Sequence, residues 1–175
     1  MYKLTAPINS GYHMWKATLE EFGDGPIDGS GYFENHPPID LSQDGFLHYL
    51  NDRAAAADPA VPPPENFVHC TYYWILNDDD VLVGFLALRH TLNQHLLEVG
   101  GHIGYSVRPS ARQKGAATAA LKLGVQEARA MGIDKVLVCV KEDNVASRTV
   151  IERCGGIFES TIRGLRRYWI NTIHA

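Results

Sequence analysis

Residues 107–118 read Val-Arg-Pro-Ser-Ala-Arg-Gln-Lys-Gly-Ala-Ala-Thr, and they join an expected strand to an expected helix. The alternating apolar run before them predicts the strand, and the apolar face after them predicts a helix of about 115–131. The first N–H groups of a helix have no intrahelical partner and lie at the positive end of its dipole. Gly115 lets a ligand approach the backbone closely, and Arg112 and Lys114 add positive charge. The stretch therefore predicts a phosphate-containing ligand at this helix start.

The patterns on both sides of this stretch predict a mixed α/β sheet. The near-continuous apolar run 135–140 is typical of a strand that is buried on both faces. The expected strands are 2–8, 67–76, 81–89, 102–107, 135–140, 157–160 and 165–172, and the expected helices are 10–22, 42–57, 92–98, 115–131 and 144–154. We expect an α/β (α+β) fold with a mixed, mostly antiparallel central sheet of about six to seven strands and helices on both faces. Residues 23–40 are rich in Gly, Pro, Asp and Asn, which predicts a long loop, either a binding loop or a plain surface excursion.

Composition limits the classes of function. The chain has 175 residues and is expected to form one domain, 1–175. Its formal net charge of -4 argues against nucleic acid as the main partner. The longest apolar run, 81–88, is too short to span a membrane, and the N-terminus lacks a signal-peptide pattern. Three cysteines without a CxxC pair, and no compact Cys/His set, predict neither disulfides nor a metal site. We expect a cytoplasmic protein.

Two segments resemble the GNAT superfamily, the Gcn5-related N-acetyltransferases. Arg112-Gln113-Lys114-Gly115-Ala116-Ala117 resembles its phosphate-arm motif, which is Arg or Gln, two residues, Gly, one residue, then Gly or Ala. Residues 143–156 resemble the next helix of the family, opened by Asn144 and closed by Gly155-Gly156. Residues 101–105 and 167–170 are similar to a bacterial branch of the superfamily. The resemblance is strong from about Val81 onward and only topological before it. It implies an acetyl-CoA-binding core at 67–175 and an acceptor-side region at 1–66.

The resemblance also implies where acetyl-CoA binds. The pantetheine would lie between the strand that ends at Val107 and the strand 135–140, paired with backbone groups of Ser106 and Val107. The phosphate arm would hold the pyrophosphate, and the residues implied in it are Arg112, Gln113, Lys114, Gly115, Ala116, Ala117 and Thr118. Asn144 and Ser147 would reach the pantetheine from the second helix. The plainer interpretations are a helix cap for Asn144 and solvated loop charges for Arg112 and Lys114.

The catalytic acid and base stay open. His102 and Glu98 are the candidate bases, because family members with a protein base often carry Glu or His before the phosphate arm; a water chain is the alternative. Many members have a Tyr seven residues after the helix-opening Asn, where this chain has Ile151. An isoleucine has no acidic proton to give to the CoA thiolate. Tyr105 or Tyr168 would have to serve as the general acid instead, or the thiolate leaves into water.

The implied function is acetyl-CoA-dependent N-acetyl transfer to a primary amine of a small molecule or peptide, by direct attack in a ternary complex. The alternative from another class is a non-catalytic acyl-CoA-binding sensor or scaffold, which Ile151 would suit. A third interpretation is another protein that binds a phosphate ligand. No membrane or nucleic-acid partner is expected, and the chain is expected to be a monomer or homodimer.

Overall fold

The computed structural model describes residues 1–33 and 37–174, and its helices and strands follow the predicted order. The strands are β1 (Lys3–Thr5), β2 (Cys70–Leu76), β3 (Leu82–Arg89), β4 (Ile103–Val107), β5 (Lys135–Lys141), β6 (Ile157–Ile162) and β7 (Leu165–Asn171). The α-helices are α1 (Tyr12–Phe22), α2 (Gln43–Ala57), α3 (Ala116–Ala130) and α4 (Val145–Arg153). Short helical turns occur at η1 (Asn9–Gly11), η2 (Leu96–Gly100), η3 (Pro109–Ala111) and η4 (Thr172–His174).

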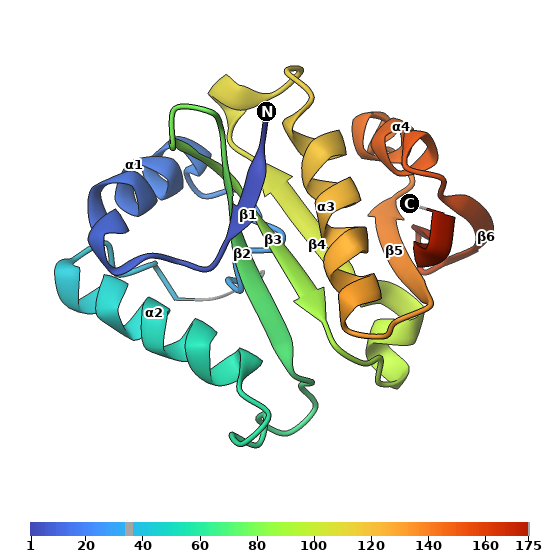
Figure 1. Ribbon diagram of the computed structural model, residues 1–175, viewed down its shortest axis with the longest axis horizontal. Coiled ribbons are helices and arrows are strands. Elements are labelled where there is room, and N and C mark those ends of the chain that lie inside the picture. The colour runs from blue at the N-terminus through green and yellow to red at the C-terminus, as the bar shows by residue number, and fades with distance from the viewer. Residues whose placement is uncertain (34–36, 175) are drawn as a thin grey trace.

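The strands form two antiparallel sheets that meet at one end. The first has the order β1-β2-β3-β4 and the second the order β5-β7-β6. They are joined by an isolated bridge between Gly101 and Val138, beside which His102 N donates to Leu137 O at 2.7 Å. Beyond this joint β4 and β5 separate, with α3 beside β4 and α4 beside β5 (Figure 1). The predicted central sheet is therefore present with seven described strands, split between β4 and β5.

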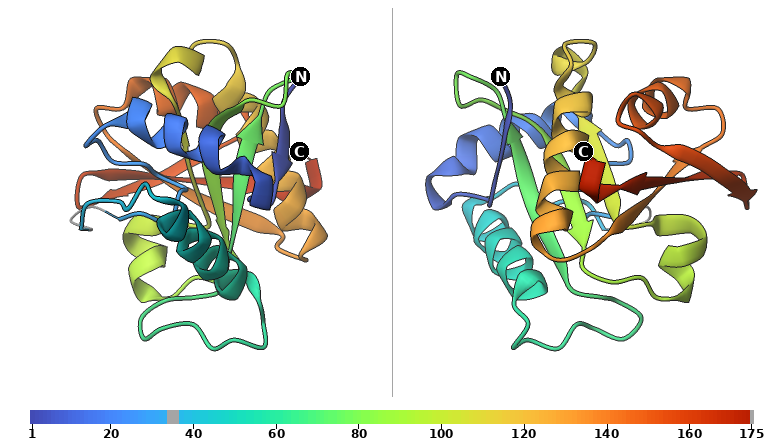
Figure 2. Two further views of the ribbon diagram at one scale, coloured as in Figure 1. Left: turned by 90° about the vertical axis from the view of Figure 1, so that its left-hand side faces the viewer. Right: turned by 45° about the vertical axis from the view of Figure 1, so that its right-hand side comes forward.

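Helices cover both faces, as predicted. On one face, α3 and α4 pack on the strands through a cluster that includes Leu86, Leu121 and Val138. On the other, α1 and α2 pack on β2 and β3 through a cluster that includes Trp15, Phe46 and Trp74. Figure 2 shows α2 and α3 on opposite sides of the four-stranded sheet. Helices thus bury both faces of the sheet, and β4 is its edge strand.

Local signals placed most element ends correctly. Ser42 Oγ accepts a hydrogen bond from Gly45 N at 3.1 Å and starts α2. The short helix predicted at 92–98 is present but shifted by two residues to 94–100, because Gly101 N donates to Leu96 O and closes a π turn over Leu96–Gly100. The predicted first strand is shorter than expected. Residues 34–36 of the predicted loop 23–40 lie outside the described residues, and its described part contains no helix or strand. Within the described ranges, no helix has the length and apolarity needed to cross a membrane.

Candidate active site

The outer edge of β4 faces the gap between the two sheets. Arg89 N donates to His102 O at 2.8 Å, and Arg108 N donates to Val83 O at 2.9 Å. In an antiparallel pair the residues bonded to the neighbour alternate, so Ser106 also directs its backbone to β3, opposite Phe85. The backbone groups of Tyr105 and Val107 point the other way, into the gap. The prediction for Ser106 is therefore corrected, because its backbone pairs with β3: the outer edge carries the backbone groups of Tyr105 and the N–H of Val107, whereas the carbonyl of Val107 accepts from Arg112 Nε.

The phosphate arm has a left-handed backbone at two positions. Gln113 has φ 59° and Gly115 has φ 83°, and α3 begins directly after Gly115 without a side-chain cap. A Cβ placed on Gly115 would meet nothing within 4 Å. The first-turn N–H groups of α3 thus have no capping side chain, and the space in front of Gly115 is open. Ala116 is buried, whereas Ala117 and Thr118 are half-buried behind the arm.

The two cations of the arm are bonded to the arm itself. Arg112 Nε donates to Val107 O at 3.0 Å, and Lys114 Nζ donates to Ser110 O at 2.8 Å. Tyr2 donates its hydroxyl to Lys114 O at 3.0 Å, so the first residues of the chain also support the arm. These bonds keep both charges beside the start of α3, where a phosphate would gain from them.

Asn144 and Ser147 lie at the start of α4. Asn144 Oδ1 accepts from Ser147 N at 3.0 Å, which is the helix-cap arrangement that was the plainer interpretation. Ser147 uses its side chain differently: its Oγ lies 2.8 Å from the hydroxyl of Tyr105 on β4. The pair bridges from β4 to α4. Burial raises the pKa of Tyr105 to about 12, so this hydroxyl keeps its proton at neutral pH.

His102 is occupied by a structural bond. Its ring is buried, and its Nδ1 accepts from Leu137 N at 2.9 Å across the joint between the sheets. The ring also packs edge-on against Trp169. Burial, with the charge of Arg89, lowers the pKa of His102 to about 4. The neutral ring has one lone pair, and Leu137 N–H takes it, so this geometry does not support His102 as a base.

Glu98 is bonded on both carboxylate oxygens. Gln94 Nε2 donates to one oxygen at 2.7 Å, and Arg163 forms an ion pair with the other at 3.3 Å. Glu98 lies on η2, and Arg163 lies in the turn between β6 and β7. The predicted base therefore ties η2 to the hairpin of the second sheet.

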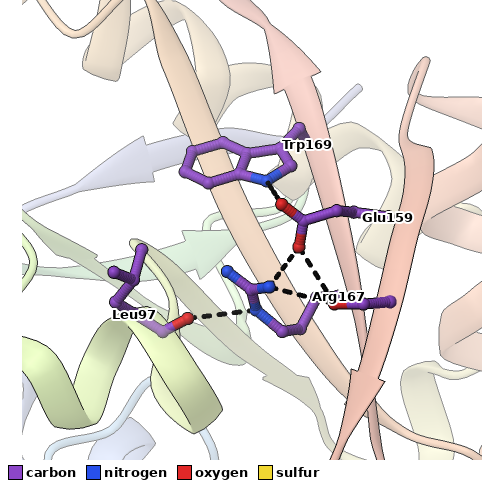
Figure 3. A network of polar contacts seen from close by, with 5 residues as sticks. Leu97, Glu159, Arg167 and Trp169 are labelled. Carbon is purple, nitrogen blue, oxygen red and sulfur yellow. Dashed lines mark hydrogen bonds and ion pairs between the residues drawn. The ribbon is translucent and has the colours of Figure 1, made fainter.

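A polar network beside Glu98 makes the same connection (Figure 3). Arg167 on β7 donates to Leu97 O at 3.0 Å and forms an ion pair with Glu159 on β6. Trp169 donates its indole N–H to Glu159 at 3.1 Å. Arg167 is only 8% exposed, so its charge depends on these partners. The network holds η2 on the second sheet and so supports the closed end of the gap.

The three positions considered for the general acid are Tyr105, Ile151 and Tyr168, and two of them lie in the hydrophobic core. Ile151 is fully buried, and so is Tyr168. The Tyr168 hydroxyl donates to Glu152 at 3.0 Å and accepts from Arg166 Nε at 2.9 Å. Tyr105 is the hydroxyl of this set that lies at the gap.

Asp28 is a residue that the sequence interpretation missed. Ser106 Oγ donates to the backbone carbonyl of Asp28 at 2.7 Å, which holds the backbone of this exposed residue against β4. The charge of Asp28 contributes to the raised pKa of Tyr105, behind burial. Gly29 follows it, and a Cβ there would lie 2.6 Å from Gly104 O. The Gly-rich composition of the loop was the available signal, but it could not indicate which strand the loop covers.

Groups of three or more His, Cys, Asp or Glu side chains that could hold a metal ion are absent from the described residues.

Comparisons with known proteins agree with this geometry. A family model described as an acetyltransferase (GNAT) domain matches residues 32–157. The solved structure of RimJ from Mycobacterium smegmatis, in complex with CoA-disulfide, is similar with a TM-score of 0.71 and 18% identity, covering 99% of this chain and 83% of that chain. A ribosomal-protein alanine acetyltransferase from Vibrio fischeri is similar with a TM-score of 0.70 and 12% identity, covering 98% and 93%. The spermidine/spermine N-acetyltransferase SpeG from Vibrio cholerae has a TM-score of 0.63 and 15% identity, covering 99% and 95%.

A search among curated protein sequences found no match. At the identities above, structural similarity shows only a shared fold. The family model matches well over half of the chain, and a match of that extent shows the family. The predicted relation to the GNAT superfamily is confirmed, and the chain belongs to the GNAT family of acetyltransferases.

Proposed function

We propose that this protein is an acetyl-CoA-dependent N-acetyltransferase that acts on a primary amine of a small molecule or peptide. The observation that supports it most is the combination of an outer β4 edge, formed by the backbone of Tyr105 and the N–H of Val107, with an uncapped helix start at Gly115. The first can pair with the amide groups of a pantetheine as an added strand, and the second can hold its pyrophosphate. A relative of this fold has been solved with CoA-disulfide.

The chemistry requires an amine, a thioester and a donor for the developing oxyanion. The amine nitrogen, once it has lost a proton, attacks the thioester carbon directly in a ternary complex. The backbone N–H of Val107 faces the gap and is our candidate donor to the oxyanion. Residues 67–175 supply the acetyl-CoA side and residues 1–66 the acceptor side in this proposal.

Asp28 is our candidate for the residue that binds the acceptor amine. It is an exposed residue whose backbone is held to β4 by the Ser106 bond, and its negative charge contributes to the raised pKa of Tyr105. A carboxylate attracts an ammonium group and favours its approach to the gap. The names of two structural relatives, a spermidine/spermine and a ribosomal-protein alanine acetyltransferase, also point to amine acceptors.

Calorimetry with acetyl-CoA tests the site. Gly115→Glu puts a carboxylate where the pyrophosphate would lie, and we expect at least ~100-fold weaker binding from charge repulsion and lost space. Gly132→Glu is the matched control, because Gly132 has φ 79° and open space but lies after the far end of α3. Equal affinity in the two variants would contradict the proposed site.

CoA-thiol release with a panel of amines separates the two classes of function. An N-acetyltransferase releases thiol with at least one amine. Binding of acetyl-CoA without release for polyamines, amino-terminal peptides and small primary amines would favour the sensor or scaffold instead.

A further inference from the structure

Arg89, the last residue of β3, lies on the face of the four-stranded sheet that Gly29 contacts. Side chains alternate along a strand, and Leu88 faces the cluster under α3, so Arg89 faces the opposite side. A Cβ placed on Gly104 of β4 would lie 3.9 Å from Arg89 Nη1 and 3.7 Å from Gly29 N. The guanidinium and the loop that carries Asp28 therefore flank the same glycine.

The guanidinium of Arg89 has one nitrogen bonded and a pair of nitrogens open. Nη1 donates to Gly100 O at 3.3 Å and to Gly101 O at 3.1 Å. Nε and Nη2 donate to none of the described residues, and neither is a buried atom without a partner, so both reach solvent. Nε–H and one N–H of Nη2 point the same way as a parallel pair, and this pair matches the two oxygens of a carboxylate.

Arg89 is also close to the joint of the two sheets. Gly101, which accepts one of its hydrogen bonds, forms the isolated bridge to Val138 of β5. Burial raises the pKa of Cys139 on β5 to about 11, and the charges of Arg167 and Arg89 act against this rise. The open pair of nitrogens therefore belongs to the closed end of the gap between β4 and β5.

The positive charge of Arg89 has no counter-charge among the described residues. None of the ion pairs that the described part of the chain forms includes it, although its side chain is half-buried. Arg167 nearby is paired with Glu159. His102 is neutral at pH 7, because burial and the charge of Arg89 lower its pKa to about 4. A half-buried cation in this situation is stabilised when an anion binds beside it.

We propose that Arg89 binds a carboxylate of the acceptor, so that the acceptor is a small amine that carries its own carboxylate. This inference rests on the proposed function. Nε and Nη2 supply two parallel donors to the carboxylate, while Nη1 stays on the carbonyls of Gly100 and Gly101. Asp28 attracts the ammonium group from the other side of Gly104. A polyamine has no carboxylate and would leave the charge of Arg89 uncompensated.

Calorimetry on the protein saturated with CoA measures this preference without turnover. The probes are glycine, β-alanine, γ-aminobutyrate and ε-aminocaproate, each against its own carboxamide. They cover short and long separations of amine and carboxylate, because Val107 lies roughly 10 Å along β4 from Gly104 at the rise of a strand. In the unaltered protein at least one acid should bind about ten- to hundred-fold more tightly than its amide. The formal net charge of -4 would by itself favour the amide.

Three variants assign the preference to Arg89. Arg89→Gln removes the parallel donors and should make acid and amide bind equally well. Arg89→Lys keeps the charge without the parallel donors, so it should keep part of the preference. Arg129→Gln is the matched control, because Arg129 is exposed in the last turn of α3 and its loss changes the net charge by the same amount. A purely structural role for Arg89 would weaken acid and amide alike and leave their ratio unchanged.

The affinity for CoA, measured first, shows that each variant is folded. If no acid binds more tightly than its amide, or if the preference persists in Arg89→Gln, this inference is wrong while the proposed function still stands on CoA-thiol release. If Arg89→Gln does not fold, Arg89→Lys decides, and an undiminished preference in it overturns the inference. If the unaltered protein binds neither CoA nor acetyl-CoA, the inference and the proposed function are both wrong.

Discussion

Replacing Gly29 with Ala should separate the acceptor side of the molecule from the acetyl-CoA side. Gly29 has φ 80°, and a Cβ there would lie 2.6 Å from Gly104 O and 2.9 Å from both Leu86 Cα and Phe85 O. All three are backbone atoms of β3 and β4, which cannot rotate away as a side chain can. The loop must therefore lift from the sheet, and Asp28 moves with it.

The cost has two parts that the structure lets us add. A residue with a side chain in the left-handed region costs about 1–2 kcal/mol. Lifting the loop also weakens the bonds from Ser106 Oγ to Asp28 O and from Arg53 Nε to Ser30 O, each worth about 0.5–1.5 kcal/mol. We therefore expect Gly29→Ala to lower the free energy of unfolding by about 2–5 kcal/mol.

Gly132→Ala isolates the first part, the cost of a side chain in the left-handed region. Gly132 has φ 79° and nothing within 4 Å of a Cβ, so this control carries only the backbone cost of about 1–2 kcal/mol. Urea unfolding measures the difference, calorimetry measures acetyl-CoA affinity, and steady-state kinetics measure KM for the amine. In Gly29→Ala we expect unchanged acetyl-CoA affinity with an amine KM raised about ten-fold, which is ~1.4 kcal/mol of lost acceptor binding. Equal stability and equal amine KM in the two variants would refute the packing of this loop on β4 and its place in the acceptor site.

Three further predictions follow from single side chains. The pKa of His102 is about 4 in the folded protein against 6.5 unfolded, so the unfolded chain takes up the proton first as the pH falls; stability should be full above about pH 6.5 and decline by up to about 3 kcal/mol toward pH 4, and urea unfolding of His102→Asn should show a flatter profile. Asp28→Asn should raise the amine KM about ten-fold without changing acetyl-CoA affinity, while Asp24→Asn in the same exposed loop changes neither; an unchanged KM in Asp28→Asn excludes the carboxylate from acceptor binding. Ile151→Ala should lower the free energy of unfolding by about 2–5 kcal/mol, because Ile151 is fully buried, and a loss below ~1 kcal/mol would mean that this position is not core.

The predictions from sequence held best where both partners of an interaction are close in the chain. Ser42 and Asn144 cap helices through hydrogen bonds to residues three positions further on, and Ser and Asn are residue types that favour this cap. The prediction of His102 and Glu98 as bases was less reliable, because a His or Glu before the phosphate arm has several possible partners. His102 was placed near the right strand, yet its lone pair is taken by Leu137 N, 35 residues away.

The sequence by itself determined the order of elements, because strand periodicity and helix caps are local properties of the chain. The family followed from the resemblance of residues 112–117 and 143–156 to GNAT motifs. Only the tertiary structure decided which groups share the gap. Tyr105 meets Ser147 across 42 residues, and Ser106 meets Asp28 across 78. Such contacts depend on how two sheets and two helices pack around one joint. The stretch 107–118 therefore carries the proposed phosphate site, whereas packing decides which residues from distant segments lie beside β4.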